Sequence, residues 1–157
     1  MAIGFTVING HRHDFSSCEI TIDGIPCTGI KEISWNHGLE PTAVRGNAPG
    51  KTGRTRGVYD AEAKITFYEA EANAFMAQLD ATGLPLGQGF MEASFLVSVS
   101  RFEAFAPPYT SLLHGCRIKK ADHQAREGGD ALAVSFDLDV MRIQENGLEP
   151  HRKSLVK

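Results

Sequence analysis

The sequence has few cysteines and no long apolar run, and each shortage excludes a class of protein. Cys18, Cys27 and Cys116 are the three cysteines among 157 residues, and no C-x-x-C pair is present. A disulfide framework or a zinc site is therefore not expected. No stretch is long and apolar enough for a transmembrane segment, and the first residues lack a basic and hydrophobic secretory signal. These features predict one soluble domain over residues 1–157 with reduced thiols.

Motifs that would carry chemistry are also missing. No serine lies in a G-x-S-x-G elbow, which excludes the usual nucleophile turn. His11 and His13, beside Asp14, form an H-x-H pair that could bind a metal if a third ligand came from elsewhere. The remaining histidines show no such ligand spacing, so we favour a surface pair without a metal. We expect no catalytic, cofactor-binding or metal-binding residue, and therefore not an enzyme.

Acidic residues and apolar periodicity are both missing between Glu40 and Asp60. Within EPTAVRGNAPGKTGRTRGVYD, the residues between these two bounding acids carry four of the sixteen Lys and Arg residues and none of the nineteen acids, which leaves a charge of -7 on the rest of the chain, from twelve cations and nineteen acids. Neither helix nor strand is predicted across it. A loop of this length is usually functional or disordered. The protein is thus an acidic body with an extended basic Gly/Pro loop at residues 40–60.

Part of this loop, Gly46 to Thr52, looks like a phosphate-binding P-loop. The spacing is one residue short, because Arg45 stands where the motif requires its first glycine. A period-two pattern follows Lys51, whereas a P-loop needs a helix whose N-terminal amides face the phosphates. Both differences argue against nucleotide hydrolysis.

Alternation of apolar and polar residues predicts about six strands around the loop. Pro26 and Gly29 indicate an edge or a bulge in the second strand. The alternating segments cover residues 18–24, 25–35, 59–68, 92–102, 109–121 and 132–140.

One helix is predicted after the third strand, because apolar residues recur there at i, i+3, i+4 and i+7. Acids near its start favour the positive end of the helix dipole, and Gly83 and Pro85 end it. The repeating residues are Ala72, Phe75, Met76 and Leu79. The sum is a mainly β (α+β) fold, a β-barrel or sandwich of about six strands with one packed helix and a long hairpin loop. The polar tail, residues 146–157, is expected to be mobile.

Three interpretations of the basic loop follow from its residues. It is a solvated flexible loop, it binds nucleic acid, or it docks on another copy of the chain. No aromatic residues interleave its cations, and the acidic body would repel a polyanion. Charge complementarity between basic arm and acidic body favours docking on another copy, and a head-to-tail contact of that kind stacks copies indefinitely.

The order of the predicted elements resembles the tail tube proteins of tailed bacteriophages. The resemblance covers most of residues 18–146, and it is carried by IKEISW (30–35), VRGNAPGKTGRTRGVY (44–59), EAKITFYEAEANAFMAQL (62–79) and GDALAVSFDLDVMRI (129–143). It implies a barrel with one helix, shared with the haemolysin-coregulated proteins of type VI secretion. It also implies hexameric rings stacked into a hollow tube, with a long loop reaching from ring to ring.

Function and partners follow from the same resemblance. It implies a virion tail protein assembled in the host cytoplasm, whose lumen lets DNA pass without specific binding. Its partners would be further copies of itself, a tape measure protein, a tail terminator, a baseplate or tip and, in a contractile tail, a sheath. The tube of a tailocin or a type VI-like injection system is the alternative, and a small nucleic-acid-binding module is the second.

Two sets of site residues are predicted. Residues expected to contact neighbouring subunits or rings, in a loop disordered in the free chain, are Arg45, Gly46, Gly50, Lys51, Arg54 and Arg56. Carboxylates expected to line the lumen, where like charge prevents adhesion of DNA, are Asp60, Glu62, Asp137 and Asp139.

Overall fold

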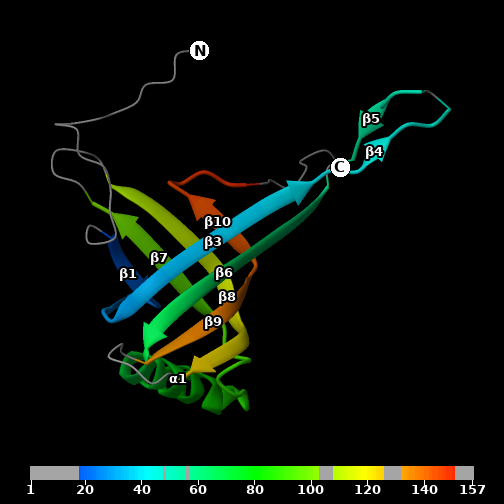
Figure 1. Cartoon of the computed structure of the whole chain (residues 1–157). Helices are drawn as coiled ribbons and strands as arrows, with labels where there is room; N and C mark the ends of the chain where they lie inside the picture. Colours follow the sequence, from blue (N-terminus) through cyan, green and yellow to red (C-terminus); the bar gives the residue numbers. More distant parts are fainter. Residues whose placement is uncertain (1–17, 48, 56, 103–107, 126–131, 151–157) are drawn as a thin grey trace.

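A computed structural model describes residues 18–47, 49–55, 57–102, 108–125 and 132–150, which form a curled antiparallel sheet with one helix at one end (Figure 1). In chain order the elements are β1 (Cys18–Ile22), β2 (Ile25–Cys27), β3 (Ile30–Glu40), β4 (Ala43–Val44), β5 (Gly53–Arg54), β6 (Val58–Tyr68), α1 (Glu69–Gly83), the 3-10 helix η2 (Leu84–Leu86), β7 (Phe95–Arg101), β8 (Tyr109–Gln124), β9 (Ala133–Val140) and β10 (Arg142–Glu145).

The main sheet has the strand order β2-β1-β7-β8-β9-β6-β3, with β10 paired to β8. Strand β8 belongs to both halves of the barrel. Its first half, up to Cys116, pairs with β7, and its second half, from Arg117, pairs with β9. The second half of β8 therefore forms a four-stranded layer with β9, β6 and β3.

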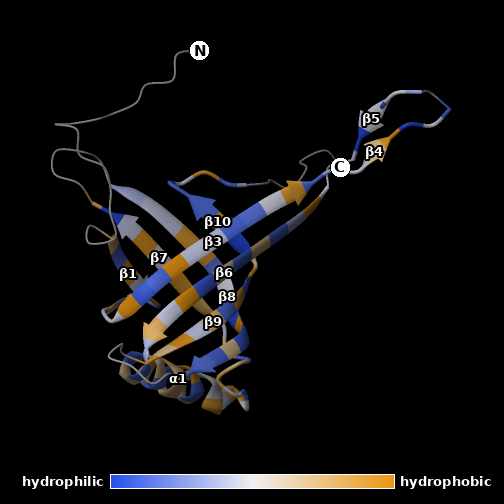
Figure 2. Ribbon diagram, in the orientation of Figure 1, coloured by the Kyte–Doolittle hydropathy of each residue, from blue (hydrophilic) through white to orange (hydrophobic). Residues whose placement is uncertain are grey.

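Strict alternation of side chains builds the core. Along β6 and β9, apolar residues such as Ile65 and Phe136 are fully buried, while the polar residues between them, apart from the buried Thr66, face solvent or are partly covered. Figure 2 shows the resulting bands of hydrophobic and hydrophilic residues along these strands. Because side chains in a strand point to opposite faces in turn, each strand carries one buried and one exposed face. The predicted period-two strands are confirmed here.

The helix closes one end of the barrel. Its buried residues are Ala72, Phe75, Leu79 and Gly83. The ring of Phe75 stacks on Phe67 at 5.0 Å between centroids and meets Phe95 and Phe136 edge-on. The helix begins at Glu69 and ends at Gly83, and Pro85 lies in η2. The predicted helix and its packing role are therefore confirmed.

The number and length of the strands differ from the prediction. The segment 25–35 is divided into β2 and β3, because Gly29 adopts a left-handed φ of +75°. The Pro26 segment is an edge strand, as predicted. β9 is followed, after Met141, by the separate strand β10. These breaks do not alter the fold class, which is confirmed as mainly β with one helix.

Three further predictions concern chemistry and location. Of the three cysteines, Cys116 is buried and Cys18 and Cys27 are half-buried. The His11 and His13 pair lies outside the described residues, as does the end of the tail, 151–157. Among the helices of the described part, none is long and apolar enough to cross a membrane.

Candidate assembly site: the basic arm and the exposed sheet face

The loop between β3 and β6 is a projecting hairpin, here called the arm (residues 41–57). The sequence predicted no strand in it, and that prediction is wrong. β4 pairs with β5 through Ala43 opposite Arg54 and Val44 opposite Gly53. The backbone N–H of Thr52 donates to the Val44 carbonyl at 2.8 Å. Backbone bonds hold this pairing without a buried side chain, so no apolar pattern in the sequence announces it.

The root of the arm contains a bulge. Glu40 faces Val58 and Ala43 faces Arg54, so Pro41 and Thr42 on one leg oppose three residues, 55–57, on the other. Gly57 adopts φ +94°, and a Cβ there would lie 2.6 Å from the Glu40 carbonyl oxygen. Only glycine fits this left-handed close approach. An extra residue on one leg bends a strand, and here it redirects the arm away from the barrel.

Side chains beneath the sheet tie the last part of β3 to β6 and β10. The Tyr59 hydroxyl lies 3.1 Å from His37 Nδ1 and accepts the Ile143 backbone N–H at 3.0 Å. His37 Nε2 lies 3.4 Å from a Glu145 oxygen, and the Trp35 indole N–H donates to the other Glu145 oxygen at 3.4 Å. Burial raises the pKa of Tyr59. This network, here called the root cluster, fixes the strands from which the arm projects.

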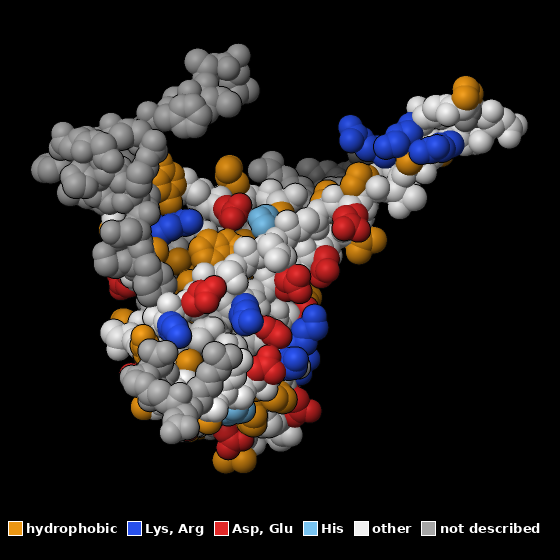
Figure 3. All heavy atoms as spheres, viewed as in Figure 1, with side chains coloured by type: hydrophobic (Ala, Val, Ile, Leu, Met, Phe, Trp, Pro, Cys, Tyr) orange, Lys and Arg blue, Asp and Glu red, His pale blue; other side chains and the backbone are white. Residues whose placement is uncertain are grey.

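The predicted arm residues are all at the surface where the structure describes them. Arg45, Gly46, Gly50, Lys51 and Arg54 are exposed, and Arg56 lies outside the described residues. Figure 3 shows the arm's cations gathered along one projecting segment, well separated from the acidic side chains of the barrel. Among the described residues, no ion pair joins Arg45, Lys51 or Arg54 to an acid of the same chain.

The predicted lumen carboxylates share one face of the four-stranded layer. Glu62, Asp137 and Asp139 project from β6 and β9 opposite to the buried apolar residues, and Asp60 continues the same alternation toward the arm. The register sets Glu62 directly across from Asp139. Asp60 lies apart from β9, opposite Gly38 of β3. Three of the four carboxylates therefore lie together, with the fourth nearer the arm.

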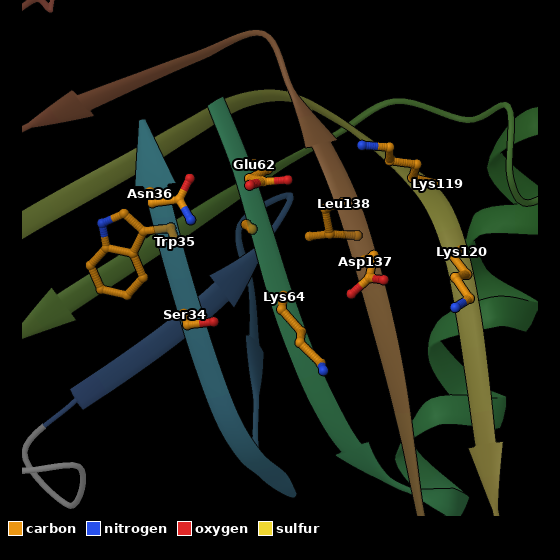
Figure 4. Close-up of a pocket in the computed structure, with 10 residues that line it drawn as sticks. Ser34, Trp35, Asn36, Glu62, Lys64, Lys119, Lys120, Asp137 and Leu138 are labelled. Carbon is orange, nitrogen blue, oxygen red and sulfur yellow. The ribbon is translucent and has the colours of Figure 1, made fainter. Parts of the chain in front are cut away.

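Lysines and arginines also lie on this face, and the sequence did not predict them there. A hollow of about 560 Å³ brings Glu62 and Asp137 together with Lys64, Lys119 and Lys120 (Figure 4). Two neighbouring cross-strand rows are Ser34, Lys64, Asp137 and Lys120, then Asn36, Glu62, Asp139 and Arg117. The face is mixed in charge rather than uniformly acidic.

The positions of these lysines on the exposed face were not equally predictable from the sequence. Lys64 stands in the same alternation as Glu62, so the period-two pattern was enough to place it. Lys119 and Lys120 lie at a register shift of β8 between Ile118 and Lys120. Such a bulge moves a residue out of strict alternation, so only the fold places both lysines at this face.

Both outer edges of the four-stranded layer are open among the described residues. β3 pairs with β6 alone, and residues 117–124 of β8 pair with β9 alone. Each neighbouring pair in the layer is antiparallel, so β3 and β8 run in opposite directions. An open edge offers unpaired backbone N–H and C=O groups to another chain. The two edges can therefore pair with each other between adjacent copies, in the antiparallel sense.

Within the described ranges, no group of three or more His, Cys, Asp or Glu residues could hold a metal ion. Burial raises the pKa of the Cys116 thiol to about 12, which makes it a poor nucleophile at neutral pH because the thiolate is the reactive form.

Solved structures of tube proteins share this architecture of a curled antiparallel sheet with one end helix. A chain from the anti-feeding prophage tube-terminating cap matches with a TM-score of 0.67 and 11% identity, over 91% of this chain and 97% of that one. The tail tube of SPP1 matches with a TM-score of 0.59 and 12% identity, over 87% and 80%. Hcp1 from Flavobacterium johnsoniae matches with a TM-score of 0.54 and 13% identity, over 86% and 98%.

Sequence comparison alone does not find these similarities. No protein-family model matches the chain, and no curated protein matches it. At such low identities the likeness establishes the fold. It confirms the resemblance in fold to tail tube and haemolysin-coregulated proteins.

Proposed function

We propose that the chain is the building subunit of a tail tube, forming hexameric rings that stack into a hollow conduit. The observation that carries this proposal is the four-stranded layer with two open edges of opposite direction. When copies stand side by side around an axis, β3 of one copy meets the second half of β8 of the next in antiparallel orientation. Repetition closes the layers into one barrel and leaves no open edge.

The exposed face of this layer would then line the lumen. Its polar rows point away from the core of each subunit, as a wall in contact with water requires. Asp60, Glu62, Asp137 and Asp139 would be lumen residues, as the sequence predicts. A phage tail tube, with DNA as the molecule that passes through, is the first setting we propose.

A second setting is the tube of a tailocin or a type VI-like injection system, and one observation favours it. Lys64, Lys120 and Arg117 stand among the carboxylates of the proposed lumen face. Each wall cation that neutralises a phosphate adds affinity for DNA. A lumen face that carries cations is therefore less suited to the free passage of DNA than a uniformly acidic face. The two settings are compared by measuring how strongly assembled tubes retain short duplex DNA as the salt concentration is varied. The measurement is made on tubes of the native chain and of Lys64→Gln.

The arm would join successive rings. Its exposed cations would contact acidic surfaces of neighbouring copies, and copies of the chain would be its principal partners. A tape measure protein, a tail terminator, a baseplate or tip and a sheath complete the proposed set, and the product would reside in the virion tail after assembly in the host cytoplasm. The match to a tube-terminating cap supports partners of this kind.

Negative-stain microscopy of the purified chain tests the proposal. We expect rings with six-fold class averages, and hollow tubes as the protein concentration rises. A chain that stays monomeric at every concentration would argue against a tube subunit. Monomers that bind duplex DNA through the arm would support the nucleic-acid-binding alternative.

A further inference from the structure

The end of the barrel opposite the arm carries two exposed leucines in one short turn. Leu84 and Leu86 of η2 are 72% and 75% exposed. Two backbone hydrogen bonds hold the segment that carries these leucines. Gly87 N–H donates to the Leu84 carbonyl at 3.1 Å, and Gln88 N–H donates to the Gly83 carbonyl at 2.9 Å. A defined turn thus holds two large apolar side chains in water, which is costly without a partner. We call this pair the apolar knob.

The surroundings of the apolar knob are acidic. Residues 69–94, which form α1, η2 and the following turn, contain four acids and no Lys or Arg. Asp80 lies one helical turn before Leu84, whose N–H bonds the Asp80 carbonyl, and Glu92 is exposed beyond η2. Among the described residues, Arg117 reaches this segment from β8, where its Nε donates to the Glu92 backbone carbonyl at 3.0 Å. The carboxylate of Asp80, which borders the knob, is exposed.

The arm has the complementary surface. A shallow hollow of about 350 Å³ lies on it, lined by apolar Pro41 and Ala43 and by the cations Lys51 and Arg54, with Thr52 and Gly53 between them. Val44, which follows Ala43 in β4, is 48% exposed. A hollow lined by apolar and cationic residues is complementary in character to an apolar side chain flanked by a carboxylate.

A chain cannot join its own two surfaces. The arm leaves the barrel where β6 begins and α1 starts where β6 ends, so the eleven residues of β6 separate them, a span of roughly 36 Å at strand spacing. Each leg of the arm has about eight residues and reaches only ~26 Å, and it projects away from α1 (Figure 1). The occupant must come from a second copy.

We propose that the apolar knob and its bordering acids form the receiving surface for the arm of a copy in the next ring. This inference rests on the proposed tube function and adds to it the surface that the arm recognises. The contact joins two different patches of identical chains, and repetition of such a heterologous contact along an axis produces an open stack. Leu86 is the anchor that fills the hollow, and Asp80 faces the cations at its rim.

Two substitutions at and beside the apolar knob, here called the body variants, test the contact through their effect on tube assembly. Asp80→Lys reverses the charge beside the knob, and Leu86→Ser removes the anchor. Met141→Ser is the matched control, because Met141 is 72% exposed between β9 and β10. We expect native thermal unfolding and normal rings for all three, with the concentration needed for tube growth raised about tenfold or more in the first two only. Normal growth of both body variants would overturn the inference.

A photo-crosslinking amino acid at position 86 tests the same contact directly. In tubes mixed from isotope-labelled and unlabelled copies, we expect the crosslinked peptide to come from residues 41–57 of another chain. Crosslinks confined to peptides outside the arm would overturn the inference. If deletion of residues 46–56 still stops tube growth in that case, the proposed function stands without this receiving surface. Native chains that form neither rings nor tubes would remove both proposals.

Discussion

The barrel and the arm are stabilised in different ways, although both are antiparallel β-structure. The barrel buries apolar side chains from every long strand, and residues such as Ile65, Phe136 and Leu113 are wholly removed from water. The arm has no buried side chain among its described residues, and its two short strands depend on backbone and threonine hydrogen bonds. Individual hydrogen bonds contribute little net stability, whereas burial dominates folding. The barrel therefore determines stability, and the arm is free to serve contact with other molecules.

The same kind of truncation should have its largest effect in the barrel. Phe75→Ala removes the ring that meets Phe67, Phe95 and Phe136, and we expect a loss of about 3–5 kcal/mol in the free energy of unfolding. Val44→Ala in the arm is the control, with an expected change within about 0.5 kcal/mol. Urea denaturation measures both. Equal losses would show that the arm contributes to the core after all.

Alkaline pH should weaken the barrel through Cys116. Burial raises its folded-state pKa to about 12, against about 8.5 for a free thiol. Its contribution to stability is full below the unfolded value and is lost as the pH rises from about 8.5 through 12. The free energy of unfolding should therefore fall less steeply in Cys116→Ala than in the native chain over this window. Parallel pH profiles of the two proteins would contradict a strongly raised thiol pKa.

A smaller effect is expected at the root cluster, where barrel and arm meet. Tyr59→Phe leaves the Ile143 N–H without the hydroxyl that accepts it, which should cost about 1–3 kcal/mol. The matched change Tyr68→Phe, at a tyrosine that is 38% exposed on the same strand, should cost less than about 0.5 kcal/mol. Thermal unfolding measures both. Equal costs at the two positions would remove the special role of the Tyr59 hydroxyl.

The fold was largely predictable because burial leaves a period in the sequence. The alternation through Phe136 and the helical spacing of Phe75 and Leu79 gave the long strands, the helix and the core. The pairing of β4 with β5 was not predictable, since it rests on backbone groups and on the hydroxyls of Thr52 and Thr55, which carry no period.

The candidate site was only half accessible to sequence reasoning. Local composition revealed the charge of the arm, and alternation placed Glu62 on an exposed face. The root cluster depends on a contact between Trp35 and Glu145, which are 110 residues apart. No local pattern reports such a pairing, and the same limit applies to the lysines that the bulge in β8 brings to the face of Glu62.

The most direct test of the assembly role compares the native chain with a chain lacking residues 46–56 by negative-stain microscopy at equal concentration. Because the arm holds no buried side chain and the barrel holds the core, we expect the deleted chain to fold and form rings but no tubes, while the native chain forms both. Tubes of normal length from the deleted chain would contradict the assembly role of the arm.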